Sequence, residues 1–337
     1  MGIILITIGD PAGSGPEIVL KALSHKKIYE RSKIAVIGSL KVLEKAREIV
    51  KANSLKLTKI EDPGEVEQFE PMNIGVVDLD NVDPRKIVYG SPSELGGRAS
   101  FEYISKAVEL ILKRKGTALV TAPISKESLH MAGINYPGHT ELLADLAGVK
   151  EVRMMLVAGN FRVSHVTTHV SLRKAIEELI KKERILKTIE MTYEALVKFF
   201  CISEPKIAVS GLNPHASENG LFGDEELREI SPAIEAARER RINALGPFPP
   251  DTIFYRAYRE KEFDAVIAMY HDQGHIPVKM VGFLEGVNLT LGLPFVRTSP
   301  DHGTAWGKAG TGLADEKATL EAIKLAIQIS ENLENNC

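Results

Sequence analysis

Residues 3–23 read IILITIGDPAGSGPEIVLKAL: an apolar run, a glycine-rich turn and an amphipathic segment. The apolar run predicts a strand over residues 3–8, because β-branched residues favour extended backbone. Pro16 suits the first turn of a helix, which we expect over residues 16–23. The turn does not match the dinucleotide-binding fingerprint, since Ile18 stands where the third glycine is required. It is either a tight strand–helix turn or a cradle of backbone N–H groups for an anion.

The same strand–helix alternation continues along the chain. Short apolar runs predict strands over residues 34–37, 74–77, 118–121, 154–157, 163–168, 206–209, 265–269 and 287–291. Amphipathic patterns predict helices over residues 40–52, 99–113, 172–199, 225–240 and 314–332, with Ser39 and Ser171 as two of the N-caps. Strands without strict polar alternation, separated by helices, are typical of parallel sheets covered on both faces. The sequence therefore predicts an α/β fold with a mostly parallel sheet.

Length and charge restrict the class of protein. A chain of 337 residues suggests roughly two domains at about 150 residues each. The net charge of −3 gives no basic excess for nucleic-acid binding, and no apolar run is long enough for a membrane span. The two cysteines, Cys201 and Cys337, cannot form a disulfide framework. We therefore expect a cytoplasmic protein with no nucleic-acid or membrane partner.

Polar residues follow the predicted strand 118–121. Ser125 and Lys126 lie in the motif at residues 121–126, and His139 and Thr140 lie in the motif at residues 137–141. Together they suit a phosphorylated or carboxylate substrate. Thr140 also suits the N-cap of a helix beginning at residue 141, and the two roles are compatible because a helix N-terminus attracts anions.

Histidines stand beyond three predicted strand ends. His165 and His169 would lie on one strand about 13 Å apart, too far to share a metal ion. His169 is favoured as a ligand because it is nearer the strand's carboxyl end. His215 and His271 follow the strands at 206–209 and 265–269. Three imidazoles at one edge of a sheet suit Zn²⁺ or a similar divalent ion.

A second glycine-rich segment lies near the end of the sequence. Residues 297–305 read RTSPDHGTA, and Gly307, Gly310 and Gly312 follow. Small residues allow the backbone to approach a nucleotide closely. The alternative is a flexible surface loop.

Eight motifs occur in order, at residues 9–17, 121–126, 138–141, 167–169, 212–216, 270–274, 286–294 and 297–305. Together they resemble the 4-hydroxythreonine-4-phosphate dehydrogenase (PdxA) family of vitamin B6 synthesis, over about residues 3–330. The resemblance implies the two-lobed α/β/α fold of the isocitrate and isopropylmalate dehydrogenases, with a cleft between the lobes. Residues 1–122 and 300–337 would form the first lobe, and residues 123–299 the second.

The resemblance also implies an activity and its residues. The enzyme would oxidise the C3 hydroxyl of 4-phosphohydroxy-L-threonine with NAD and a divalent ion, and would then decarboxylate the β-keto acid for pyridoxal phosphate biosynthesis. The ion would be zinc, with magnesium, manganese or cobalt as alternatives, held by His169, His215 and His271. The substrate-binding positions would be His139, Thr140, Lys279, Asn288 and Arg297. The NAD-binding positions would be His302, Gly303, Thr304, Ala305, Gly310 and Gly312. The family resemblance further implies a homodimer with active sites at the subunit interface.

Two aspartates are candidates for the general base. Asp272 follows His271, and it would either accept the proton or orient the histidine as a metal ligand. Asp251 is the second candidate. Lys126, Lys279 and Arg297 would form a small cationic pocket for one phosphate.

One departure from the family pattern concerns the substrate. Residues 271–277 read HDQGHIP, where the B6 enzymes read HDQGLP, and this form is similar to the paralogous D-threonate or D-erythronate 4-phosphate dehydrogenases. His275 would lie one helical turn from His271, or would be a surface residue. The motifs also leave open a phosphate acyltransferase on a related scaffold, a non-catalytic sugar-phosphate binding protein and a hydroxy-acid dehydrogenase of the isopropylmalate type.

Overall fold

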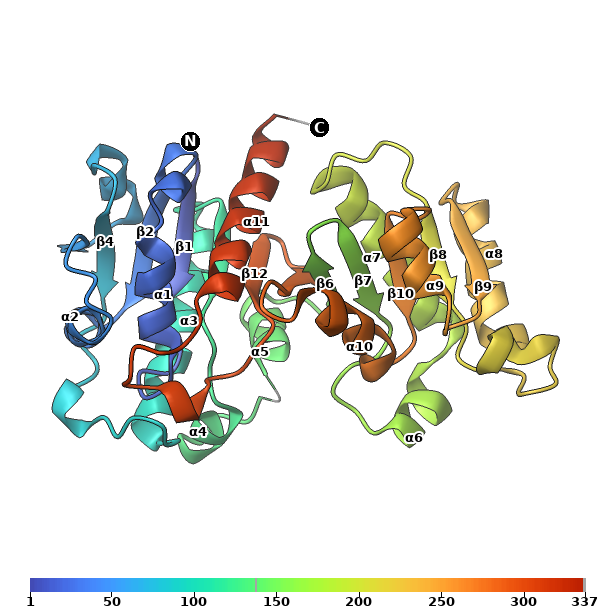
Figure 1. Ribbon diagram of the computed structural model, residues 1–337, viewed down its shortest axis with the longest axis horizontal. Coiled ribbons are helices and arrows are strands. Elements are labelled where there is room, and N and C mark those ends of the chain that lie inside the picture. Colours follow the sequence, from blue (N-terminus) through green and yellow to red (C-terminus); the bar gives the residue numbers. More distant parts are fainter. Residues whose placement is uncertain (137, 336–337) are drawn as a thin grey trace. The chain divides into compact units, whose positions relative to one another are not determined.

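The computed structural model describes residues 1–136 and 138–335 (Figure 1). The chain divides into two compact units. Unit 1 is Met1–Val152 with Leu293–Glu331, and unit 2 is Arg153–Gly292 with Asn332–Cys337. The sequence predicts lobe boundaries at residues 122 and 299, whereas these units divide the chain at residues 152 and 292. Cys337, one of the two cysteines, and Pro137 of the motif at residues 137–141 lie outside the described residues.

Unit 1 is built on a parallel sheet with the strand order β3-β4-β2-β1-β5-β12. Its strands are β1 (Ile3–Thr7), β2 (Lys33–Gly38), β3 (Lys56–Ile60), β4 (Asn73–Asp78), β5 (Ala118–Thr121) and β12 (Val296–Pro300). Its helices are α1 (Gly15–Leu23), α2 (Leu40–Ile49), α3 (Glu94–Leu112), α4 (Lys126–Met131), α5 (His139–Leu146) and α11 (Lys317–Glu334). The central strands β1 and β5 are buried almost throughout, as expected for a parallel sheet with helices packed on it (Figure 1).

Unit 2 carries a mixed sheet with the order β11-β6-β7-β10-β8-β9, antiparallel at β11–β6 and β6–β7 and parallel elsewhere. Its strands are β6 (Arg153–Ala158), β7 (Phe161–His165), β8 (Ile207–Ser210), β9 (Ala244–Phe248), β10 (Ala265–Ala268) and β11 (Val287–Leu291). Its helices are α6 (Leu172–Lys174), α7 (Lys182–Lys198), α8 (Ser231–Glu239), α9 (Ile253–Tyr255) and α10 (His271–Gly282). Apolar clusters on this sheet, around Ile189 and Ile267 and around Phe161 and Val266, form the core.

Short irregular helical turns connect these elements. The 3₁₀ turns are Lys26–Glu30, Pro63–Gln68, Pro84–Lys86, Pro214–Glu218 and Trp306–Lys308. The π turns are Ala175–Leu179, Glu226–Ile230 and Arg256–Glu260. The predicted α/β class and mostly parallel pairing are confirmed, and Ser39 and Ser171 cap their helices as expected.

Several boundaries differ from the prediction for physical reasons. β3 and β9 were missed because each lies at a sheet edge: β3 is half-exposed and rich in lysine, and β9 contains Gly-Pro, which an edge strand tolerates. β12 was missed because its polar sequence is nevertheless buried. The long helix predicted over residues 172–199 is interrupted at Ile180 (φ −80°, ψ 79°), and α7 begins at Lys182. β7 ends at His165, three residues before the predicted end.

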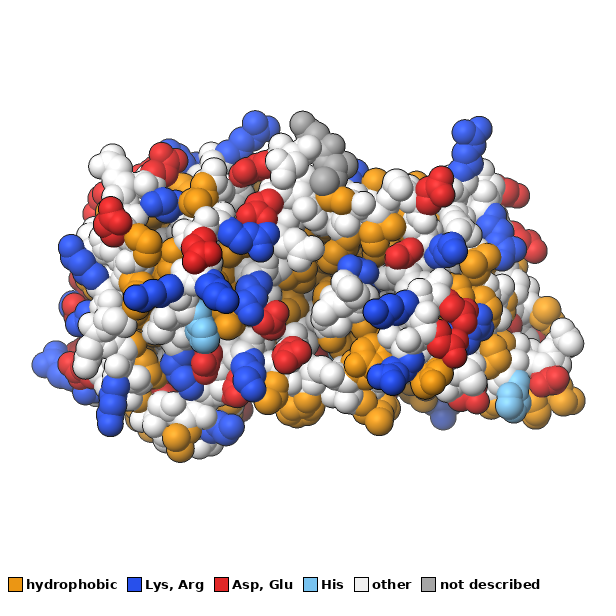
Figure 2. Space-filling view, turned by 45° about the horizontal axis from the view of Figure 1, so that its top comes forward, with side chains coloured by type: hydrophobic (Ala, Val, Ile, Leu, Met, Phe, Trp, Pro, Cys, Tyr) orange, Lys and Arg blue, Asp and Glu red, His pale blue; other side chains and the backbone are white. Residues whose placement is uncertain are grey.

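The surface agrees with a near-neutral composition. Figure 2 shows acidic and basic side chains interspersed over the face in view, with no continuous basic stripe on that face. In the part of the chain that the structure describes, no helix has both the length and the hydropathy needed to cross a bilayer.

Candidate active site

Two of the three predicted metal ligands lie together in unit 2. His169 is exposed in the turn after β7, and His271 is the first residue of α10. Their ring centroids are 6.0 Å apart. Nδ1 of His271 is 2.6 Å from Oδ1 of Asp272, so the carboxylate orients this ring and leaves Nε2 as the nitrogen that faces another partner.

His215 does not join this pair. It lies in the turn Pro214–Glu218, where the backbone is left-handed from His215 to Asn219, and its ring is 6.3 Å from that of Phe222. Among the residues described, no three His, Cys, Asp or Glu side chains are grouped closely enough to hold a metal ion. The structure therefore unites His169 with His271 and leaves His215 apart.

His275 is buried, so its interpretation as a surface residue is wrong. Because residues 271–282 are helical, His275 lies one turn from His271, and the two rings stack at 3.6 Å with an interplanar angle of 11°. Its Nδ1 is 3.0 Å from the carbonyl oxygen of His271 and 3.1 Å from Nε2 of His165. His275 thus forms a buried support for the His271 ring.

His165 completes this support from β7. Its Nδ1 is 3.4 Å from the carbonyl oxygen of Met154. Burial, followed by the nearby His275, lowers the pKa of His165 to about 3, so the ring is neutral. Because Nε2 of His165 and Nδ1 of His275 are 3.1 Å apart, a hydrogen bond between the two neutral rings requires a proton on one of these nitrogens and a lone pair on the other. Because β7 ends here, His165 and His169 do not share a strand face as the sequence predicted.

Arg297 interacts with His139, and both are predicted substrate-binding residues in unit 1. Arg297, in β12, is only 1% exposed, and Nε and Nη2 donate to Oγ1 of Thr121 at 3.2 and 2.6 Å. Burial lowers the pKa of Arg297 to about 9. The pKa of His139 is well below its usual value because of burial and then the charge of Arg297. Nε2 of His139 is itself buried without a hydrogen-bond partner among the described residues, so this nitrogen could accept a hydrogen bond from a polar ligand or donate one to it.

The start of α5 differs from the prediction. The helix begins at His139 with Gly138 at the N-cap, so Thr140 lies inside its first turn and is not the N-cap. Ser125 is occupied as the N-cap of α4, where its side chain accepts from the backbone N–H of Ser128 at 3.0 Å. Lys126, the next residue, approaches α5: a methyl group at Gly138 would lie 3.6 Å from its Cε. Lys126 therefore lies beside the start of α5, and Ser125 has a structural role as the N-cap of α4.

The proposed NAD-binding loop is fastened to one face of α1. Backbone N–H and Oγ of Ser14 both lie 2.9 Å from the carbonyl oxygen of Thr304. The carboxylate of Glu17 accepts from the backbone N–H groups of Gly310 and Gly312 at 2.5 and 2.7 Å. Nζ of Lys21 donates to the carbonyl oxygen of Ala314 at 2.5 Å. The spacing of three and then four residues places all three side chains on the same helix face.

The loop itself is open on its outer side. His302 and Gly303 are exposed, and a methyl group at Gly303 would meet no atom within 4 Å. Ala305, Gly310 and Gly312 have left-handed backbone. Glu17 was not singled out from the sequence; the available signal was an acidic residue in the first turn of a helix that follows a glycine-rich turn.

The remaining predicted residues lie on separate elements of unit 2. Lys279 is in α10, with Nζ 5.7 Å from the ring centroid of Phe283. Asn288 is in β11, and its Oδ1 is buried without a hydrogen-bond partner within the described part of the chain. Asp251 is exposed between β9 and α9, whereas Asp272 contacts His271 directly. This geometry favours Asp272 as the residue that orients His271.

Comparisons with known proteins agree with the resemblance read from the motifs. A family model described as "Pyridoxal phosphate biosynthetic protein PdxA" matches residues 30–326. The D-threonate 4-phosphate dehydrogenase of Cupriavidus necator is 47% identical over 329 residues, which cover 97% of each chain. The 4-hydroxythreonine-4-phosphate dehydrogenase of Trichlorobacter lovleyi is 44% identical over 328 residues, again 97% of each chain. A crystal structure of a 4-hydroxythreonine-4-phosphate dehydrogenase from Burkholderia phymatum is 47% identical, with a TM-score of 0.85 and 98% of each chain covered. The chain therefore belongs to the PdxA family of pyridoxal phosphate biosynthetic proteins.

Proposed function

We propose that this protein is a metal- and NAD-dependent dehydrogenase acting on a 4-phosphorylated four-carbon hydroxy acid, with 4-phosphohydroxy-L-threonine as the first candidate. NAD⁺, when bound, would accept the hydrogen on C3 as a hydride, and the hydroxyl proton would pass to a base. The resulting β-keto acid then loses CO₂ and gains a proton on carbon. The observation that carries the proposal is the His169–His271 pair with Asp272 on Nδ1 of His271.

The metal ion would be held by His169, His271 and His215. When bound, a divalent ion lowers the pKa of a coordinated hydroxyl group and stabilises negative charge on its oxygen. Neutral imidazole nitrogens oriented by a carboxylate suit zinc, with magnesium, manganese or cobalt as alternatives. Asp272 is then a positioning residue, and Asp251 remains the other candidate for the base.

Unit 1 would bind the anionic groups of the substrate. Arg297 and Lys126 supply positive charge, and the buried Nε2 of neutral His139 supplies a hydrogen bond. Thr140, Lys279 and Asn288 are the other proposed contacts, and the Oδ1 of Asn288, which has no partner among the described residues, supports a polar ligand there. NAD would bind at His302–Ala305, Gly310 and Gly312, which are held by α1.

We also propose a cytoplasmic homodimer with active sites at the subunit interface. Ile276, Met280 and Phe283 are 58, 82 and 74% exposed along one side of α10 and just beyond it. An apolar row of this kind on a soluble enzyme is typical of a subunit contact. His271 begins the same helix, and His215 is separated from it within one chain. Both observations favour a site that a second copy completes.

D-Threonate or D-erythronate 4-phosphate is the second candidate substrate. His275 favours it, because this histidine departs from the B6 pattern and packs directly on His271. The test is NADH formation at 340 nm with each of the three phosphorylated acids, before and after chelation of the metal. We expect turnover with one of them that EDTA abolishes and added Zn²⁺ or Mn²⁺ restores. Absence of NADH with all three, or full activity in His271→Ala, would overturn the proposal.

A further inference from the structure

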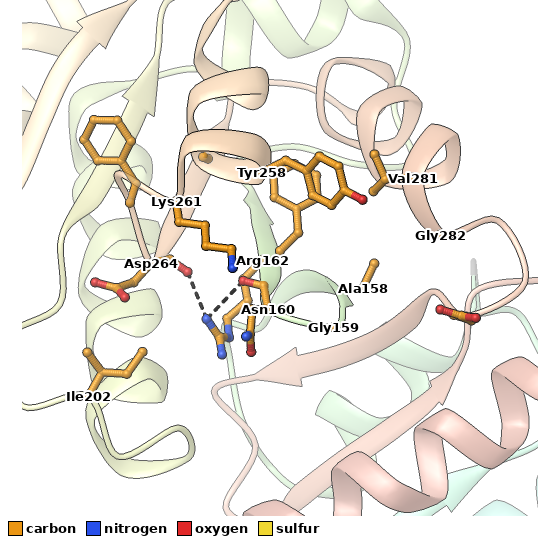
Figure 3. A pocket seen from close by; sticks show the side chains of 14 residues that line it. Ala158, Gly159, Asn160, Arg162, Ile202, Tyr258, Lys261, Asp264, Val281 and Gly282 are labelled. Carbon is orange, nitrogen blue, oxygen red and sulfur yellow. Dashed lines mark hydrogen bonds between the residues drawn. The ribbon is translucent and has the colours of Figure 1, made fainter.

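Unit 2 contains a cavity that none of the proposed active-site residues lines. Its volume is about 600 Å³, and it lies where the turn of the β6–β7 hairpin, the π turn Arg256–Glu260 with the residues that follow it, and the C-terminal end of α10 approach one another (Figure 3). The residues that decide its chemistry are Arg162, Lys261, Phe161 and Tyr258.

Arg162 is a buried cation that forms no ion pair within the described part of the chain. The residue is 8% exposed, and Nη1 donates to the carbonyl oxygens of Asn160 and Asp264, both at 3.2 Å (Figure 3). Its Cζ lies 4.1 Å from the ring centroid of Phe200. Nε is buried and has no hydrogen-bond partner in the described structure. These contacts hold the guanidinium in place but do not neutralise it, and burying an unpaired charge is unfavourable.

Lys261 adds a second positive charge to the same wall. It follows the π turn in left-handed conformation (φ 55°), and Figure 3 shows its side chain extending toward Arg162. The charge of Asp264 acts on Arg162 without forming an ion pair with it. The Asp264 carboxylate points away from Arg162 in this view and accepts from the backbone N–H of Lys206 at 2.8 Å. Glu285 is the other acidic residue of the lining.

Aromatic and aliphatic side chains also line the cavity, together with the polar residues Asn160, Asp264 and Glu285. Phe161 and Tyr258 pack edge to face with their centroids 5.5 Å apart, and Ile202, Phe263 and Val281 are also in the lining. A cavity that is cationic at one end and aromatic along its side is complementary to an anion with an apolar body.

We propose that this cavity binds a small organic anion with an aromatic body, whose phosphate or carboxylate pairs with Arg162 and Lys261. The site is separate from the proposed dehydrogenase residues, so the proposal does not depend on that activity. A charged group accepting from both cations would supply the ion pair that Arg162 lacks among the described residues.

The test is calorimetric titration of the full chain with phenyl phosphate, benzoate and inorganic phosphate. We expect phenyl phosphate or benzoate to bind more tightly than inorganic phosphate, because only the first two fill the aromatic part. Arg162→Met and Lys261→Met should each weaken this binding by about tenfold or more, the usual effect of losing a charged hydrogen bond. Lys51→Met is the matched control, since Lys51 is an exposed lysine with φ 56° outside the cavity.

Three results would overturn the proposal. One is wild-type affinity in Lys261→Met, which tests the site even if Arg162→Met fails to fold. The second is no binding of either aromatic probe up to about 10 mM, well above the concentration at which a specific small-molecule site fills. A loss of affinity confined to His139→Ala would place the probe in the proposed active site and would also reject the cavity.

Discussion

Replacing Glu17 by alanine tests how the proposed NAD-binding loop is held. Glu17 is 1% exposed, and its two carboxylate oxygens accept from the backbone N–H groups of Gly310 and Gly312 at 2.5 and 2.7 Å. No other side chain described in the structure is bonded to both of these glycine N–H groups. Removal of the carboxylate therefore detaches Gly310 and Gly312 from α1. The hydrogen bonds of Ser14 to Thr304 and of Lys21 to Ala314 remain and hold the loop on either side of these glycines.

The expected loss of stability follows from these two contacts. A hydrogen bond to a charged acceptor contributes about 1.5–3 kcal/mol, so two would contribute about 3–6 kcal/mol. Gly310 and Gly312 are half-exposed, so water will replace part of the hydrogen bonding that their backbone N–H groups lose when the Glu17 carboxylate is removed. We therefore expect Glu17→Ala to lower the free energy of unfolding by about 2–4 kcal/mol.

Urea unfolding followed by circular dichroism measures the global loss, and Trp306 reports the loop. It is the single tryptophan of the chain and lies in the same loop, so its fluorescence should change in native buffer. The KM for NAD should rise more than the KM for the substrate. Glu94→Ala is the control. Glu94 also lies in the first turn of a helix, but it is exposed, and among the described residues it pairs only with Arg98, at 2.7 Å. We therefore expect Glu94→Ala to lower the free energy of unfolding by about 0.5 kcal/mol. A loss below about 1 kcal/mol in Glu17→Ala, with unchanged fluorescence, would refute the reasoning.

Three further predictions concern unit 2. The unfolded chain binds a proton on His165 below pH 6.5, whereas the folded protein does not bind one until about pH 3. The free energy of unfolding should therefore fall by about 2 kcal/mol between pH 7 and pH 5. Urea unfolding at several pH values measures this fall, which should be smaller in His165→Leu. Asp272→Asn should weaken Zn²⁺ binding about 10–100-fold, because His271 loses the charge that orients it; competition with a chelating dye measures the affinity, and an unchanged value would remove Asp272 from this role. Met280→Glu should convert the proposed dimer to monomers because it places a charge in the exposed apolar row; light scattering decides, with the exposed Lys86→Glu, outside that row, as control.

The alternation of strands and helices was predictable because it depends on local sequence. Buried strands such as β1 and β5 are continuous apolar runs, and a serine at each of two N-caps marks a helix start. The ordered motifs were equally local, and they indicated the family before any side chain was placed. Strands β3, β9 and β12 escaped prediction because their environment, at an edge or inside a polar part of the core, depends on neighbours distant in the chain.

The sequence by itself thus determined the fold class, the family and most of the candidate residues, since periodicity and motif spacing are properties of short segments. Only the tertiary structure decided how those residues are supported. It buried His275 against His271 and His165, which stands 110 positions earlier in the chain. It brought Glu17 to a loop 293 positions away, and among the described residues it left His215 outside the histidine pair. Such contacts form when distant segments pack into one core, and no local pattern encodes them.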